Sequence, residues 1–153
     1  MRQKGFTLIE LMVVISVTAV LGTLGIAGFV NYNRVQAVQV SANDLATILN
    51  LARSRALSQV KLGATCKTQT LEGYSVETFS NNSYSLKIYC PRPVSQELDK
   101  KTLPQGITFK SSPTTFFFPV LTGGVETGGK IVITNSVTDK TITINSLGGV
   151  AVQ

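Results

Sequence analysis

The sequence lacks histidine and tryptophan, and it has few charges for a chain of 153 residues. Without histidine, the Ser-His-Asp and Cys-His mechanisms are excluded, and so is any zinc site that needs an imidazole ligand. Acidic residues number only 8, and in the later chain they are scattered without the spacing of a metal-binding loop. We therefore expect no enzyme, no metal site and no cofactor.

Charge is also nearly missing from the first part of the chain. The segment from Phe6 to Val30 contains Glu10 as its only charged residue. As an α-helix it would be about 37 Å long, which exceeds the roughly 30 Å hydrocarbon core of a bilayer. Arg2 and Lys4 precede it, and cytoplasmic flanks are typically basic. The segment is therefore predicted to span a membrane, with a cytoplasmic N-terminus and an exported C-terminal part.

The start of this segment resembles a known processing signal. The stretch Lys4-Gly5-Phe6-Thr7-Leu8-Ile9-Glu10-Leu11-Met12-Val13-Val14 is similar to the class III signal of type IV pilins and type II secretion pseudopilins. The resemblance implies cleavage after Gly5 by a prepilin peptidase and N-methylation of Phe6, the new terminal residue. It also implies that the partners are other pilin or pseudopilin subunits, an inner-membrane assembly platform and the membrane.

Glu10 is the anomaly of the apolar segment, because a charge there costs roughly 2.5 to 3.5 kcal/mol on insertion scales. The family resemblance associates this carboxylate with the N-terminal amine of a neighbouring subunit during filament assembly. An amine with a pKa near 7.7 to 8 is mostly cationic at neutral pH, so it can compensate the carboxylate in a low-dielectric bundle. The alternative is that Glu10 reaches the membrane interface as a tolerated acid near the helix end.

The glycines of the apolar segment have two interpretations. Gly22, Gly25 and Gly28 lie three residues apart, a spacing that permits close helix packing or weakens the helix by roughly 1 kcal/mol per glycine. Many pilins carry a proline in this region, whereas this chain has Ala27.

Apolar residues at steps of three and four continue beyond this segment, so a helix is predicted from Phe6 to about Ser58. Its later half should pack on a sheet, while Ser41, Asn50, Arg53 and Ser54 lie largely elsewhere. The predicted buried stripe consists of Val35, Val38, Ala42, Leu45, Leu49, Ala52 and Ala56.

The segment from Leu49 to Leu57 resembles the GspH/FimT family of minor pilins and pseudopilins. That family often carries an acid where this chain has Arg55. Arg53 and Arg55 are either a basic contact for a neighbouring subunit or part of the solvated face of the helix.

Alternation and turn residues predict a β-rich head after the helix. A hairpin is expected from Gly73–Phe79 and Tyr84–Cys90, and a second from Lys130–Thr134 and Lys140–Ile144. Residues 107–110, 114–118 and 149–152 supply further short strands. The stretch from Pro91 to Gln105, rich in proline and charge, reads as an exposed loop. Phe116, Phe117 and Phe118 form either an interaction patch or part of the core or a domain interface.

Cys66 and Cys90 are the only cysteines. In an exported head, an even pair suggests one disulfide worth about 3 kcal/mol in the chain-entropy model. Two free thiols are the alternative, in an organism with little oxidising capacity.

The expected fold class is α+β, a long N-terminal helix packed on a C-terminal antiparallel sheet. We expect a leader (1–5), a membrane and assembly helix (6–30), an amphipathic helix entering the head (31–60) and an extracytoplasmic head (61–153). The resemblance implies a minor pilin or pseudopilin that resides in the inner membrane and then in a pilus or pseudopilus.

The alternative function is a DNA-binding minor pilin for natural transformation, as in some relatives that use a basic tail. Residues 146–153 contain no Lys or Arg, so we expect no nucleic acid as a partner. Arg92, Lys100, Lys101 and Lys110 would be the other source of a basic patch.

Overall fold

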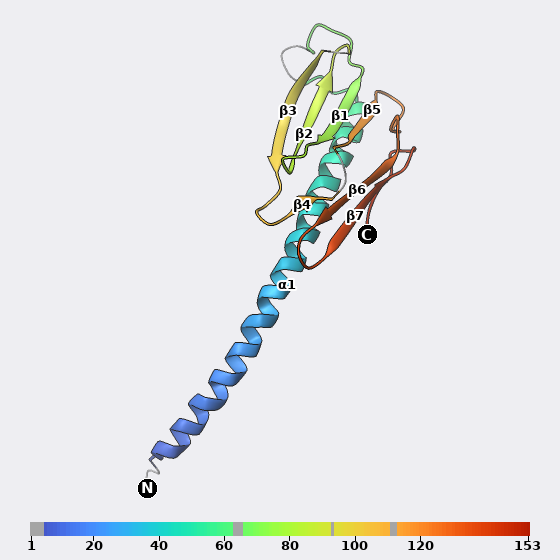
Figure 1. Cartoon of the computed structure of the whole chain (residues 1–153). Coiled ribbons are helices and arrows are strands. Elements are labelled where there is room, and N and C mark those ends of the chain that lie inside the picture. The colour runs from blue at the N-terminus through green and yellow to red at the C-terminus, as the bar shows by residue number, and fades with distance from the viewer. Residues whose placement is uncertain (1–4, 63–65, 93, 111–112) are drawn as a thin grey trace.

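The computed structural model of the chain describes residues 5–62, 66–92, 94–110 and 113–153. Over these residues it contains one helix, α1 (Leu8–Leu57), and eight strands. Figure 1 shows α1 as a long rod whose first half projects from the head, while the strands gather around its second half. The α+β fold class expected from the sequence is confirmed.

The described strands form two antiparallel sheets. The strand order is β3-β2-β1-β5 in the first sheet and β4-β6-β7-β8 in the second. The bounds are β1 (Gly73–Thr78), β2 (Ser83–Tyr89), β3 (Ser95–Thr102), β4 (Thr108–Phe109), β5 (Thr115–Pro119), β6 (Gly129–Thr134), β7 (Asp139–Ile144) and β8 (Val150–Val152). Both predicted hairpins are confirmed, as β1–β2 and β6–β7.

The second half of α1 buries its apolar stripe against the head. Six of the seven predicted stripe residues are fully buried, and Val35 is half-buried. Ser41 was expected off this face but is buried. Its hydroxyl donates a hydrogen bond to the Ala37 carbonyl at 2.9 Å, so the helix itself satisfies the polar group. A serine can therefore lie within the packed face.

The two sheets contribute to one core together with α1. In the first sheet, Tyr74 lies between Ile88 of β2 and Phe118 of β5 in the strand register. In the second sheet, Ile131 of β6 is paired with Ile142 of β7. All five side chains are fully buried, as expected for residues of period 2 on the inner face of a sheet.

The three consecutive phenylalanines of β5 are all buried, so the interaction patch considered above is wrong. Phe116 and Phe118 belong to the core under the sheet. Phe117 points to the opposite face, where the Arg92 guanidinium lies 4.1 Å from its ring centroid. The Tyr89 ring meets Phe117 edge-on at 5.5 Å. Alternation alone would have exposed Phe117, and these two side chains cover it.

The predicted loop from Pro91 to Gln105 is wrong over most of its length. Residues 95–102 form β3, which pairs with β2 at one edge of the first sheet. Its side chains are mostly exposed. Pairing of an edge strand uses backbone groups, and charged side chains there discourage pairing with other chains. The charges that suggested a loop are therefore those of an edge strand.

Candidate functional site

The N-terminal motif enters α1 through a capped helix start. Thr7 has an extended backbone conformation, with φ −81° and ψ 148°. Its hydroxyl oxygen accepts a hydrogen bond from the Glu10 backbone N–H at 3.3 Å. The Thr-x-x-Glu spacing is a helix-start signature. It would have placed the start at Leu8 from the sequence alone.

The peptide bond between Gly5 and Phe6 precedes this cap. Both residues are exposed and lie outside the helix. A Cβ built on Gly5 would meet no atom within 4 Å. Exposed backbone outside regular structure is the preferred substrate of proteolysis. Cleavage after Gly5 and methylation of Phe6 stay predictions, and residues 1–4 of the expected leader lie outside the described residues.

The large apolar side chains that the structure describes in the first half of α1 are exposed. By length and composition, α1 is the one helix in the described part of the chain that could cross a membrane. Burial of apolar surface is worth roughly 25 cal/mol per Å², so this rod needs lipid or other helices around it. The exposed large apolar residues of this half are Leu8, Ile9, Leu11, Met12, Val13, Val14, Ile15, Val17, Val20, Leu21, Ile26, Phe29, Val30 and Tyr32, and Phe6 just before the helix is exposed as well.

Glu10 lies on this apolar rod with its side chain exposed. Across the described ranges, its carboxylate forms no ion pair with Lys or Arg. A carboxylate in a low-dielectric environment needs a compensating charge or hydrogen-bond donors. When Glu10 lies in lipid or among other helices, the charge or hydrogen-bond donor that compensates its carboxylate therefore comes from outside the described residues.

The glycines leave the surface of the rod open. α1 runs without a break through Gly22 and Gly28. A Cβ at either position would meet no atom within 4 Å. The surroundings of the side chains at positions 25 and 27 lie outside the described part. Small residues on one helix allow the backbone of another helix to approach closely.

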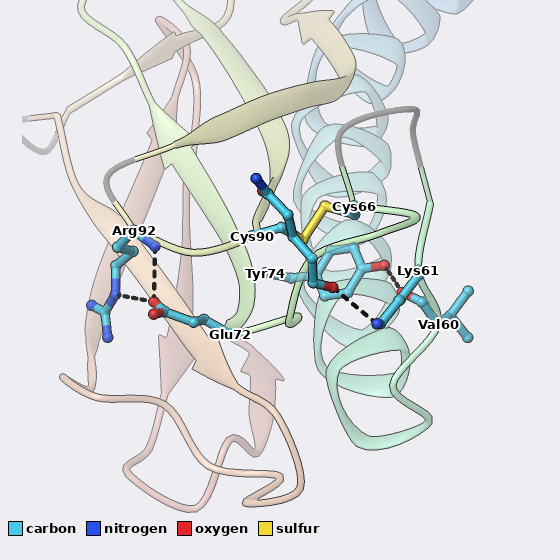
Figure 2. Close-up of a disulfide and its surroundings, with 8 residues drawn as sticks. Val60, Lys61, Cys66, Glu72, Tyr74, Cys90 and Arg92 are labelled. Carbon is cyan, nitrogen blue, oxygen red and sulfur yellow. Dashed lines mark hydrogen bonds and ion pairs between the residues drawn. A yellow bond between two sulfur atoms is a disulfide. The ribbon is translucent and has the colours of Figure 1, made fainter.

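At the other end, α1 is tied to the first sheet by the contacts in Figure 2. Cys66 and Cys90 form a disulfide, and their Cα atoms are 5.4 Å apart. The Tyr74 hydroxyl donates a hydrogen bond to the Val60 carbonyl just after the helix. Burial raises the pKa of Tyr74, although the nearby Arg55 charge opposes this rise. The chain that follows α1 is thus held at several points against β1 and the end of β2.

Arg92 lies beside the disulfide and forms ion pairs with two carboxylates of the head. Its Nε donates to Glu72 at 3.1 Å, and its Nη2 donates to Glu126 at 2.9 Å. The hydrogen bonds from Glu126 and Glu72 raise the pKa of the Arg92 guanidinium. Figure 2 shows the contacts with Glu72. This network links the end of β2 to the segments before β1 and β6, which sequence patterns do not bring together.

The four cations considered as a basic patch do not gather at one place. Lys110 pairs with Asp139 at 2.8 Å, and this contact, together with one from Thr134, lowers the pKa of the Asp139 carboxyl. Arg92 follows one end of β2, whereas Lys101 is paired in register with Tyr84 near the other end. Two of the four are neutralised by carboxylates, which leaves little charge for phosphate contacts.

Arg53 is used inside the molecule. The side chain is half-buried, and its Nε donates to the Gly123 carbonyl at 2.7 Å. Gly148 lies directly beneath, since a Cβ there would approach the Arg53 Nε to 3.0 Å. Of the two alternatives for Arg53, a fully solvated side chain is wrong, because a loop 70 residues later packs on it, and a contact with a neighbouring subunit stays a prediction. Arg55 is also half-buried, in the last turn of α1.

Comparisons with known proteins agree with the motif and with the fold. Residues 1–26 match the family model described as the prokaryotic N-terminal methylation motif. Prepilin peptidase-dependent protein D of Escherichia coli (strain K12) is 54% identical over 37 residues, which cover 24% of this chain and 25% of that protein. The chain therefore matches about a quarter of the length of this curated relative.

Most of the fold also has a counterpart among solved structures. The minor pseudopilin EpsH from the type 2 secretion system of Vibrio cholerae superposes with a TM-score of 0.55, over 76% of this chain and 94% of that chain. The sequence identity is 11%, so this likeness concerns the fold. The methylation motif and the prepilin peptidase-dependent relative match the N-terminal part of this chain, and the likeness to the minor pseudopilin concerns its fold; all three findings support a similarity to the type IV pilin and pseudopilin superfamily.

Proposed function

We propose that the chain is a minor pilin or pseudopilin of the GspH/FimT type, a structural subunit of a type IV pilus or type II secretion pseudopilus. Prepilin peptidase cleaves it after Gly5, and Phe6 becomes the methylated N-terminal residue. The observation that carries the proposal is the exposed apolar half of α1, which lies largely within the matched motif and contains Glu10, a carboxylate with no ion pair among the described residues.

Before assembly, the first half of α1 lies in the inner membrane. The N-terminus is cytoplasmic, and the head from about residue 61 is extracytoplasmic. During assembly at an inner-membrane platform, this half leaves lipid for a bundle of sibling helices. Both surroundings satisfy its apolar surface, but only the bundle supplies the amine of a neighbouring subunit to Glu10. Glu10 thus favours the filament over the membrane.

Replacement of Glu10 tests this role. In Glu10→Ala, membrane insertion should be intact, because the variant removes a charge from the apolar rod. Recovery of the chain with filament components should fall about tenfold, the equivalent of about 1.4 kcal/mol of lost association. Asp44→Ala is a matched control, since it removes an exposed carboxylate from the second half of α1. Equal incorporation of Glu10→Ala and the unmodified chain would refute the assignment.

A further inference from the structure

The end of the head nearest the exposed first half of α1 contains a hollow beside the helix. We call this end the head base, and it consists of residues 31–37 of α1, the turn 103–107 before β4 and the β6–β7 turn 135–138. Figure 1 shows β4 and the β6–β7 turn beside α1, where the rod leaves the head. A cavity of about 270 Å³ opens here, lined by residues that include Arg34, Gln105, Asn135 and Ser136.

The head base is held in place by Asn135. Its Nδ2 donates to the Arg34 carbonyl at 2.8 Å, which joins the turn to α1. Its Oδ1 accepts the backbone N–H groups of Val137 and Thr138, at 2.8 and 2.9 Å. One side chain therefore both shapes the turn and fixes it to the helix. The hollow is built before any partner binds.

The described head base carries one positive charge, the guanidinium of Arg34. Arg34 is exposed and, among the described residues, forms no ion pair. The three segments of the head base contain no Asp or Glu. The acid that follows the turn, Asp139, is already paired with Lys110. A guanidinium with neutral hydrogen-bonding neighbours is suited to a phosphate group, which it can bind through two parallel N–H bonds.

The position of Arg34 identifies the source of the phosphate. It lies four residues beyond Val30, the end of the apolar run, or about 6 Å further along the helix axis. When the apolar run spans a bilayer, this distance places Arg34 in the headgroup layer. Tyr32 on α1 and Val137 at the tip of the turn are exposed there. Aromatic side chains are favoured at that depth.

We propose that the head base is a docking surface for the phosphate groups of membrane lipids, with the Arg34 guanidinium as the anion ligand. The proposal rests on the proposed function, because it requires α1 to be inserted in a membrane. Docking fixes the height and orientation of the head while the subunit is stored. When the subunit enters a filament, Arg34 gives up its contacts with lipid phosphates and contacts neighbouring subunits in their place.

Hydrogen exchange of the full chain in nanodiscs tests this docking. Discs of phosphatidylglycerol and phosphatidylethanolamine are compared with discs of a phosphate-free glycolipid. In the phospholipid discs, the amides of residues 105–107 and 136–138 should exchange about fivefold more slowly. Arg34→Gln should abolish this difference, and Arg34→Lys should retain part of it. Lys67→Gln, which removes an exposed cation outside the head base, should leave it unchanged.

Each other outcome has a defined meaning. Equal exchange in both disc types, or an undiminished difference in Arg34→Gln, would overturn the proposal. If added inorganic phosphate protected these amides in glycolipid discs, the ligand of Arg34 would be a free anion and the lipid proposal would be overturned. Protection that occurs only in filaments would assign Arg34 to a neighbouring subunit. Flotation of the chain with the discs is measured in parallel: failure to float contradicts the proposed function itself, whereas flotation without protection contradicts only the docking.

Discussion

The two halves of α1 belong to one continuous helix but have opposite surroundings. In the first half, large apolar residues such as Leu8 and Ile26 are 77% and 67% exposed. In the second half, Leu45 and Leu49 are completely buried under the two sheets. The second half is amphipathic and the first is apolar all round. The head thus covers one face of the second half, whereas the all-round apolar half needs lipid or other helices around it.

The comparison predicts that the same kind of truncation has different effects in the two halves. Leu45→Ala should lower the free energy of unfolding of the head by about 3 to 5 kcal/mol, because it leaves a cavity in the core. Val17→Ala, in the exposed half, should leave that free energy unchanged. Denaturant unfolding of the full chain in detergent, followed by tyrosine fluorescence, measures both. Similar losses in the two variants would contradict the separation into halves.

The disulfide provides a second test of how the packed half is held. Replacing Cys66 and Cys90 by serine should destabilise the head by about 3 kcal/mol, since the cross-link restricts the unfolded chain. Dithiothreitol should lower the free energy of unfolding of the unmodified chain by a similar amount and leave that of the double variant unchanged. Non-reducing mass spectrometry of the purified chain checks that the bond is present. Two alkylatable thiols in that experiment would remove this tether from the comparison.

The smallest predicted effect concerns Arg53 at the end of the packed half. Arg53→Met keeps the apolar stem but leaves the Gly123 carbonyl without its donor, which should cost about 1.5 kcal/mol. Arg34→Met is the control, because its exposed guanidinium forms no ion pair within the described ranges. Both variants are compared by their unfolding midpoints in detergent. A larger loss for Arg34→Met would show that the head depends on the cation nearer the bare half.

The parts of the fold that local patterns specify could be predicted from the sequence. The stripe from Val38 to Ala56 follows from the helical period, and the hairpins follow from alternation between turn residues. β3 could not be recognised in this way, because an edge strand with exposed charges carries no apolar alternation. Its pairing with β2 depends on backbone hydrogen bonds that leave no mark on residue type.

The candidate site was predictable only where its residues are close in sequence. Gly5, Phe6 and Glu10 form one short motif, so their association is visible without a structure. The contact of Arg53 with Gly123 joins residues 70 positions apart. The same holds for Asn135 and Arg34, which are 101 positions apart. Such pairs are set by how the head folds around α1, and neither residue type nor spacing announces them.

The continuity of α1 has a mechanical consequence. Because no break separates its exposed half from its packed half, a pull on the rod acts on the head along the helix axis. The load is in shear, so the contacts along the packed stripe resist it together and not one after another. The disulfide lies beyond the C-terminal end of α1 and links the segment that follows the helix to the end of β2. The chain can therefore transmit tension from the first half of α1 to the head without first extending a linker.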